Sequence, residues 1–259
     1  MSETRPQKRA GNTATVIYNS LREDILSGKY PAGAPLPQLT IARDFGTSRG
    51  PVREALQRLQ QEQLVIARAN QRYNVAPFEI SDFESLLSLM LLNMTIAIRV
   101  CVPLLKDKDL DEIEERANAL IAASTTREIV AWETASREFC LLMVAPAGER
   151  TSVLIAHFLD NLQRYRSTIL SRSPHASVMS DFPHVWRPDS EELRAVVQAA
   201  RKRDAVRAAS HYANYFCRLS MLILAGAAPR HDPVIFRRTV DAILGENDAT
   251  SLPVLRNSA

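Results

Sequence analysis

The chain has 259 residues, of which 46% are apolar, and a formal net charge of +3. This length accommodates two domains, and the apolar fraction is sufficient for buried cores, which excludes a disordered chain. Residues 1–80 carry 11 Lys and Arg against 7 Asp and Glu, whereas the remainder carries 21 against 22. The positive excess therefore lies in the first part of the chain, where it favours attraction to nucleic acid.

The N-terminal part begins with helical patterns. Asn12 or Thr13 can cap a helix whose apolar residues recur at near-helical spacing until Gly28 ends it. Residues 30–35 predict a turn-rich connection, and residues 38–45 a short second helix. We expect residues 1–12 to form a mobile arm.

A third helix follows Gly46 after three or four residues, which is helix-turn-helix spacing. Ser48 is placed to cap it, and Pro51 lies in its first turn, where a missing N–H is tolerated. Arg49 and Arg53 are four residues apart and project from one face, while another face is apolar. This is the pattern of a DNA recognition helix, in which arginine reads the O6 and N7 atoms of guanine. A surface helix with scattered arginines is the alternative.

Two short strands, at residues 64–68 and 73–75, predict a β-hairpin beside this helix. Such a hairpin, or wing, can touch the DNA backbone or the minor groove. Its turn contains Asn70 and Arg72, and asparagine tolerates the left-handed conformation of a tight turn.

Residues 13–78 together resemble the winged helix-turn-helix of the GntR family of bacterial transcription regulators. The resemblance rests on residues 21–28 (LREDILSG), residues 48–56 (SRGPVREAL) and Leu59 with Leu64. It implies that Arg49 and Arg53 contact DNA and that Ser48 contacts phosphate. Two departures are Leu39, where the family often has a charged residue, and a wing tip that is not rich in glycine. The expected DNA contacts are Ser48, Arg49, Gly50, Arg53, Asn70 and Arg72.

Residues 81–245 predict an all-helical bundle, followed by a mobile tail at 246–259. Several helix starts carry capping patterns: Ser81 with Glu84, Asp189 with Glu192, Asp204, and Asp232 before Pro233. Helices are expected near residues 81–104, 108–123, 127–145, 150–172, 189–202, 204–226 and 233–244. The stretch 171–188 is expected to be irregular, either a lid or a simple connection. The predicted fold class is mainly α, a winged helix-turn-helix followed by a helical bundle.

This second part is similar to the FCD domain of FadR-like GntR proteins, which binds an effector and dimerises. Many FCD domains hold a divalent metal with one Asp and three His. The corresponding positions here carry Ser136, Cys140, Leu193 and Tyr215, which are not a metal-ligand set. We therefore expect no metal and no other cofactor. Cys101, Cys140 and Cys217 lack CxxC spacing and are expected to be reduced core residues.

Without a metal, a cavity in the bundle would have mostly apolar walls; a filled core is the alternative. The expected effector-pocket residues are Leu87, Leu91, Phe139, Cys140, Leu193 and Tyr215, with Arg150 or His211 placed to meet a charged group of the ligand. A largely apolar effector follows, because burying an unpaired carboxylate is costly.

The sequence contains no phosphate-binding loop, zinc-protease motif or nucleophile elbow, so an enzyme is not expected. The absence of a signal peptide, long apolar span or lipidation motif predicts a cytoplasmic protein with no membrane partner. The predicted function is a homodimeric transcription regulator, a repressor released from a short inverted repeat in double-stranded DNA by an apolar metabolite. Alternatives are a small carboxylate effector or a re-sited metal, and an architectural DNA-binding protein without an effector.

Overall fold

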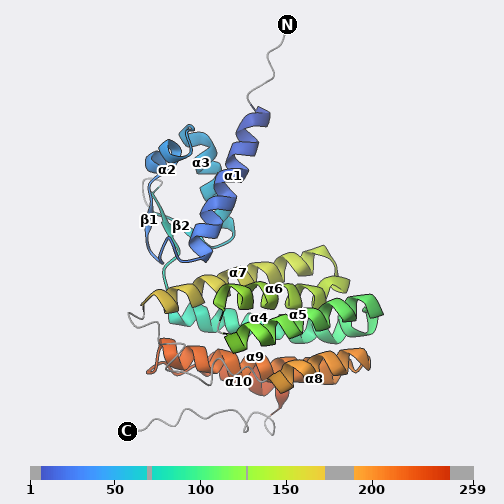
Figure 1. Cartoon of the computed structure of the whole chain (residues 1–259). Coiled ribbons are helices and arrows are strands. Elements are labelled where there is room, and N and C mark those ends of the chain that lie inside the picture. The colour runs from blue at the N-terminus through green and yellow to red at the C-terminus, as the bar shows by residue number, and fades with distance from the viewer. Residues whose placement is uncertain (1–6, 69–71, 127, 173–189, 246–259) are drawn as a thin grey trace. The chain divides into compact units, whose positions relative to one another are not determined.

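The computed structural model describes residues 7–68, 72–126, 128–172 and 190–245. Contacts divide the chain into two compact units, one of residues 1–79 with 163–172 and one of residues 80–162 with 173–259. The first unit combines helices with a small sheet, and the second is built of helices (Figure 1). The predicted fold class is confirmed.

Residues 7–75 of the first unit form three helices and a three-stranded antiparallel sheet of order β1-β3-β2. These elements in chain order are α1 (Gln7–Leu26), β1 (Pro35–Leu36), α2 (Gln38–Asp44), α3 (Arg49–Gln61), β2 (Val65–Arg68) and β3 (Arg72–Val75). The predicted helices and the hairpin are all present. In the hairpin, Val65 pairs with Val75 and Arg68 with Arg72.

Two expectations for this unit need correction. Helix α1 begins at Gln7, before the predicted cap at Asn12 or Thr13; residues 1–6 lie outside the described residues. Pro35 and Leu36, expected in a turn, form strand β1 and pair with Asn74 and Tyr73 of the hairpin. A two-residue strand has no periodicity of its own, and its pairing partner lies almost forty residues further along the chain.

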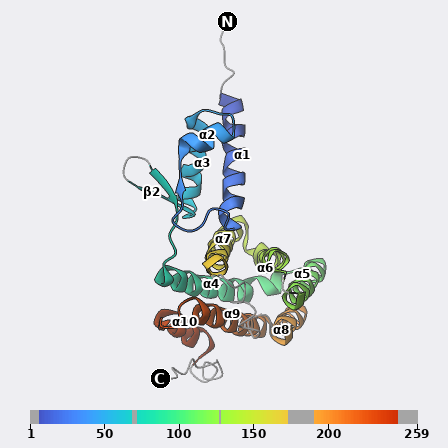
Figure 2. The same cartoon turned by 60° about the vertical axis from the view of Figure 1, so that its left-hand side comes forward.

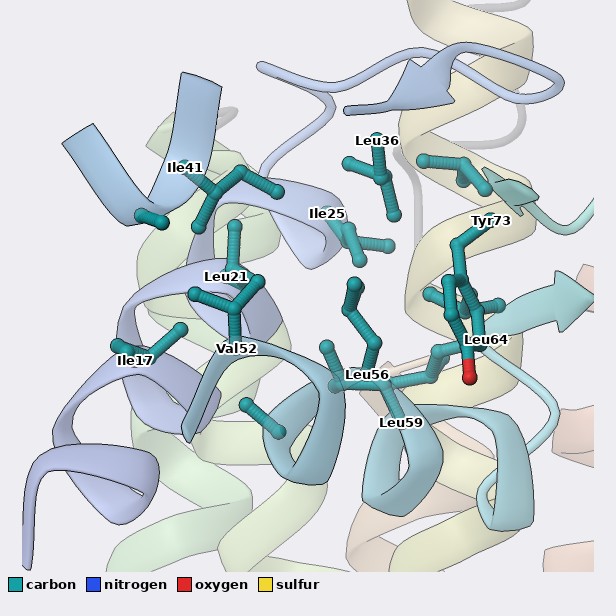
Figure 3. Packing of buried hydrophobic residues seen from close by; sticks show 14 of the residues in the cluster. Ile17, Leu21, Ile25, Leu36, Ile41, Val52, Leu56, Leu59, Leu64 and Tyr73 are labelled. Atoms are coloured by element: carbon teal, nitrogen blue, oxygen red, sulfur yellow. The ribbon is translucent and has the colours of Figure 1, made fainter. Parts of the chain in front are cut away.

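The apolar faces of α1 and α3 form the core of the first unit (Figure 3). Ile17 and Leu21 of α1 point toward Val52 and Leu56 of α3, and all four are 0–1% exposed. Leu64, in the loop before β2, and Tyr73 of β3 close the cluster on the sheet side. Burying each of these large side chains stabilises the fold by roughly 1.5–3 kcal/mol, so the orientation of α3 is strongly fixed.

The second unit is a bundle whose helices match the predicted ones to within three residues at either end. The elements are α4 (Ile80–Cys101), η2 (Val102–Leu104), α5 (Asp107–Thr126), α6 (Ile129–Val144), η3 (Ala145–Ala147), α7 (Glu149–Arg172), α8 (Ser190–Arg201), α9 (Ala205–Ala227) and α10 (Val234–Leu244). Helix α4 packs against α9 and α10 on one side and α6 on another, and α5 packs between α6 and α8 (Figure 2). Most of the stretch expected to be irregular, residues 173–188, lies outside the described residues.

The predicted caps had mixed outcomes. Asp204 caps α9, since its carboxylate accepts a hydrogen bond from the Arg207 N–H. The cap of α10 is Pro233 rather than Asp232. Ser48 occupies the N-cap position of α3 with an extended backbone, but its side chain makes no capping hydrogen bond. Asp189 lies outside the described residues.

Glu84 was expected to cap its own helix, and this prediction is wrong. Its buried carboxylate accepts a hydrogen bond from the Phe236 N–H at 2.9 Å and lies 2.7 Å from His231 Nε2. Phe236 is in the first turn of α10, where free N–H groups and the helix dipole favour a carboxylate. Glu84 thus joins α4 to α10 across 152 residues of chain.

Helix α4 also corrects the expectation that no long apolar span exists. Residues 80–104 are long and apolar enough to cross a membrane, with a mean hydropathy of 1.9. However, 61% of the most apolar stretch is buried by other parts of the protein. Such burial is typical of a helix in the core of a folded domain.

The end of α7 belongs by its contacts to the first unit. Arg164 is buried, and its Nη1 donates hydrogen bonds to the carbonyl oxygens of Ala76, at 3.0 Å, and Pro77, at 3.3 Å. Its guanidinium also lies 4.3 Å from the centre of the Tyr165 ring. These contacts offset part of the cost of burying the arginine, whose Nε is buried without a hydrogen-bond partner among the described residues.

A polar cluster supplements the apolar contact between α1 and α3. The Tyr18 hydroxyl donates a hydrogen bond of 2.5 Å to Glu62 Oε1, and the Arg58 guanidinium lies 4.2 Å from the centre of the Tyr18 ring. Arg58 also donates to Thr15 Oγ1 at 3.2 Å. Burial and the neighbouring Glu62 carboxylate raise the pKa of Tyr18 from 10.0 to about 12.

This pKa predicts a specific loss of stability in alkali. The folded state holds the phenol proton more tightly than the unfolded state, so the contribution of Tyr18 is complete below pH 10 and is lost as the pH rises toward 12. Urea unfolding at pH 9 and pH 11 should show a larger drop in stability for the natural protein than for Tyr18→Phe. Equal drops would show that Tyr18 titrates alike in both states.

Candidate nucleic-acid interface

The first unit has a surface hollow of about 860 Å³ between α2, α3 and the sheet. Four arginines line it, Arg49 and Arg53 from α3 and Arg68 and Arg72 from the hairpin. No acidic residue is among its lining residues: Pro35, Leu36, Pro37, Gln38, Leu39, Arg49, Gly50, Arg53, Arg68, Arg72, Tyr73 and Asn74. We call this surface the arginine hollow.

The two sides of α3 explain how the arginines are presented. Val52, Ala55, Leu56 and Leu59 are fully buried and hold the back of the helix against the core. Arg49 and Arg53 are exposed, and both line the hollow. The apolar face of α3 therefore fixes the direction in which its arginines point.

The charges in the hollow have no acidic partner. Within the described part of the chain, none of Arg49, Arg53, Arg68 and Arg72 forms an ion pair with a carboxylate. By contrast, Arg22 of the same unit lies 3.5 Å from Glu62. Four unpaired guanidinium groups around one concave surface repel each other and form a site for a polyanion.

The remaining predicted DNA-contacting residues lie on the same side of the unit, as far as they are described. Gly50 lines the hollow, and a Cβ atom built on it would meet only the Ser48 hydroxyl at 3.9 Å, so a ligand can approach its backbone closely. Ser48 is exposed at the start of α3. Arg72 lies at the start of β3, and Asn70 is outside the described residues. Arg68 and Leu39 also line the hollow, and neither was predicted as a DNA contact from the sequence.

The predicted effector-pocket residues lie in the second unit, on α4, α6, α7, α8 and α9. Six of them are buried: Leu87, Leu91, Phe139, Cys140, Leu193 and Tyr215. At Cys140 the helices α6 and α9 meet directly, because Cys140 Sγ lies 3.7 Å from the hydroxyl of Tyr212. Tyr212 was not proposed from the sequence, since it reaches Cys140 only because α6 and α9 both pack against α4. Burial raises the pKa of Tyr212 well above 10.0, so its hydroxyl is neutral.

The two charged residues proposed for this pocket are placed differently. His211 is half-buried, and its Nδ1 lies 2.6 Å from Glu192 Oε2. Arg218 also approaches Glu192, at 3.8 Å. Arg150 is exposed near the start of α7. A ligand that reaches His211 would therefore also meet a carboxylate.

The residues at the metal positions of the FCD resemblance do not fit a metal. The set Ser136, Cys140, Leu193 and Tyr215 contains no imidazole or carboxylate, and Leu193 cannot coordinate. Nearby, burial raises the pKa of the Cys217 thiol to about 12, which disfavours a thiolate ligand. Among the described residues, no group of three or more His, Cys, Asp or Glu side chains is arranged to hold a metal.

Comparison with protein families assigns both parts of the chain. Residues 13–75 match the model of bacterial regulatory proteins of the gntR family, and residues 89–216 match the FCD domain. The chain belongs to the GntR family. It is a DNA-binding transcription regulator of the FCD type, and the family consists of transcription regulators rather than enzymes.

Individual relatives agree with this assignment. The chain is similar to the Uxu operon regulator of Haemophilus influenzae, with 25% identity over 213 residues, 76% of this chain and 77% of the relative. It is 26% identical over 138 residues to an uncharacterised HTH-type regulator of Agrobacterium vitis, covering 52% and 81% of the two chains.

Solved structures show the same fold. E. coli McbR/YncC aligns with a TM-score of 0.62 at 18% identity, covering 81% of this chain and 96% of that one. A putative GntR regulator from Rhodococcus sp. RHA1 aligns with a TM-score of 0.64 at 18% identity, covering 82% and 97%.

The arginine hollow predicts two classes of DNA-binding defect. Arg49→Ala and Arg53→Ala should each cost roughly 1–3 kcal/mol on a sequence selected by the natural protein, and much less on random DNA. Arg72→Ala should weaken binding to both DNAs equally. It should also reduce, by about one, the slope of log affinity against log salt concentration. Fluorescence anisotropy at several salt concentrations measures all three effects.

Arg43→Ala is the matched control, since Arg43 is an exposed arginine of α2 that does not line the hollow and pairs with Asp44. Its affinity for both DNAs should stay close to that of the natural protein. If Arg49→Ala and Arg53→Ala lose the same affinity for both DNAs, these arginines contact phosphate groups rather than bases.

Proposed function

We propose that the protein is a homodimeric, ligand-responsive repressor that binds a short inverted repeat through the arginine hollow of each subunit. The observation that carries this proposal is the set of four arginines without acidic partners beside the exposed face of α3. Arg49 and Arg53 are assigned to guanine edges, Ser48 and Gly50 to backbone contacts at the start of α3, and Asn70 and Arg72 to the wing contact. A two-fold dimer presents identical helices to symmetric half-sites.

The exposed side of α4 supports the dimer. Four large apolar side chains, between 41 and 59% exposed, follow one another at spacings of three and four residues: Leu89, Leu92, Ile96 and Val100. This spacing places them on one stripe of the helix. A contiguous apolar stripe of this kind marks an interaction surface, and a second copy of the chain would cover it with the same stripe.

A charge in this stripe should separate the subunits. Ile96→Glu should convert a dimer to a monomer in analytical ultracentrifugation, because the new carboxylate would be buried without a partner. Affinity for an inverted repeat should fall with it, while a single half-site should be bound as before. Val130→Glu is the control, since Val130 is 81% exposed on α6 and lies outside the stripe. A dimeric Ile96→Glu protein would contradict the assignment of the interface.

The effector proposal rests on the chemistry around Cys140. The buried side chains there are apolar or neutral, from Phe139, Cys140 and Leu193 to Tyr212 and Tyr215. An unpaired carboxylate buried among them would be costly, and the residues at the metal positions cannot supply a cation. We therefore assign a largely apolar effector, with any charged group directed to His211 or Arg150. Its binding would weaken DNA binding, and DNA would weaken effector binding by the same factor.

A thermal-shift screen of the full chain tests this effector class. Aromatic, terpenoid and acyl compounds should raise the melting temperature, because a ligand that binds only the folded state stabilises it. Addition of the best compound should then lower affinity for the selected DNA. Elemental analysis that finds about one metal per chain, or a small dicarboxylate as the tightest ligand, would contradict the proposal.

A further inference from the structure

One large apolar side chain lies in the arginine hollow and contributes little to the core. Leu39, the second residue of α2, is 61% exposed. The next residues of the same helix on its inner side, Ile41 and Ala42, are 3% and 5% exposed. Helix α2 is therefore held in place by Ile41 and Ala42, while the Leu39 side chain remains mostly exposed.

Leu39 shares the hollow with the arginines assigned to base reading. It lines the same surface as Arg49, Gly50 and Arg53 of α3. The backbone at Gly50 is open, because a Cβ atom there would meet only Ser48 Oγ at 3.9 Å. A base edge that approaches Arg49 and Gly50 would therefore come close to Leu39 as well.

The four arginines favour DNA as the occupant of the hollow. Leu39 further indicates which group on a DNA base lies against it. Base edges in the major groove present nitrogen and oxygen atoms together with one apolar group, the C5-methyl of thymine. Covering an exposed leucine with that methyl removes apolar surface of both partners from water, whereas a phosphate or a carbonyl edge would leave it unmatched.

We propose that Leu39 is a specificity-determining residue that contacts the C5-methyl of one thymine in each half-site, beside the guanines contacted by Arg49 and Arg53. This inference rests on the proposed function, in which the hollow receives the major groove. Leu39 then contacts an apolar methyl group, while the arginines hydrogen-bond to guanine edges of neighbouring base pairs.

Replacement of thymine by deoxyuridine removes only the methyl group, which makes the test direct. The full-length protein would first select its preferred sequence from a pool of random double-stranded DNA. Each thymine of that sequence is then replaced in turn by deoxyuridine, and the dissociation constants are measured. One replacement per half-site should weaken binding roughly three- to fivefold, the factor expected for one buried methyl group.

The decisive comparison is between protein variants on these DNAs. Leu39→Ala should bind the thymine sequence about as weakly as the natural protein binds the deoxyuridine sequence, and the replacement should have no further effect on it. Thr40→Ala, an exposed neighbour on α2 that does not line the hollow, should keep the full methyl effect. Melting temperatures of both variants should equal that of the natural protein, because neither side chain is buried.

Two results would overturn the inference while leaving the proposed function standing. In the first, binding to the selected sequence depends on Arg49 and Arg53 but no deoxyuridine replacement weakens it. In the second, the methyl effect persists in Leu39→Ala. If the pool yields no preferred sequence, or if Arg49→Ala and Arg53→Ala bind it normally, the DNA-reading assignment and this inference both fail.

Discussion

The packing of α1 against α3 is the contact on which the arginine hollow depends. Val52 and Leu56 of α3 are fully buried against Ile17 and Leu21 of α1. Because residues on a helix repeat every 3.6 positions, burial of these side chains leaves Arg49 and Arg53 on the outside. The Tyr18–Glu62 hydrogen bond and the Arg58 contacts with Tyr18 and Thr15 reinforce the same pair of helices. The direction of the arginines is therefore a consequence of the core.

The arginine hollow combines this rigid helix with the sheet. Arg72 begins β3, which pairs with β2 on one side and with the short strand β1 on the other, so the wing is anchored by both neighbours. Phosphate groups of DNA bound in this hollow would offset the charge of its four arginines. The binding of DNA should therefore depend strongly on salt, while base contacts add the sequence preference.

Much of this architecture could be predicted from local sequence patterns. The helix-turn-helix, the hairpin and the helices of the bundle follow from apolar periodicity, glycine stops and proline positions, which act over a few residues. Features that depend on distant partners were missed or wrong. Strand β1 needs Tyr73 and Asn74, and Glu84 serves α10 rather than its own helix. Tyr212 meets Cys140 only because α6 and α9 both pack against α4. A short local pattern contains no information on such pairings.

The candidate site likewise contains residues that local sequence patterns predicted and residues that they did not. Arg49 and Arg53 were predicted because the helical pattern and the family resemblance both mark them, and the structure places them in one hollow. Arg68 joins them because it pairs with Arg72 in the hairpin; the sequence predicted the hairpin but not that Arg68 lines the hollow. In the second unit, the buried residues were predicted as apolar positions, but the pairing of His211 with Glu192 depends on how α8 packs against α9.

Methylation of guanine N7 provides the most direct test of the central claim, that Arg49 and Arg53 read guanine edges in the major groove. Methylation interference on the selected sequence should identify guanines in each half-site whose modification blocks binding of the natural protein. Arg49→Ala should lose this sensitivity at one guanine and Arg53→Ala at another, because the arginine that contacts N7 is absent. If no guanine methylation interferes, or if both variants keep the full pattern of the natural protein, the account of the arginine hollow as a base-reading site is wrong.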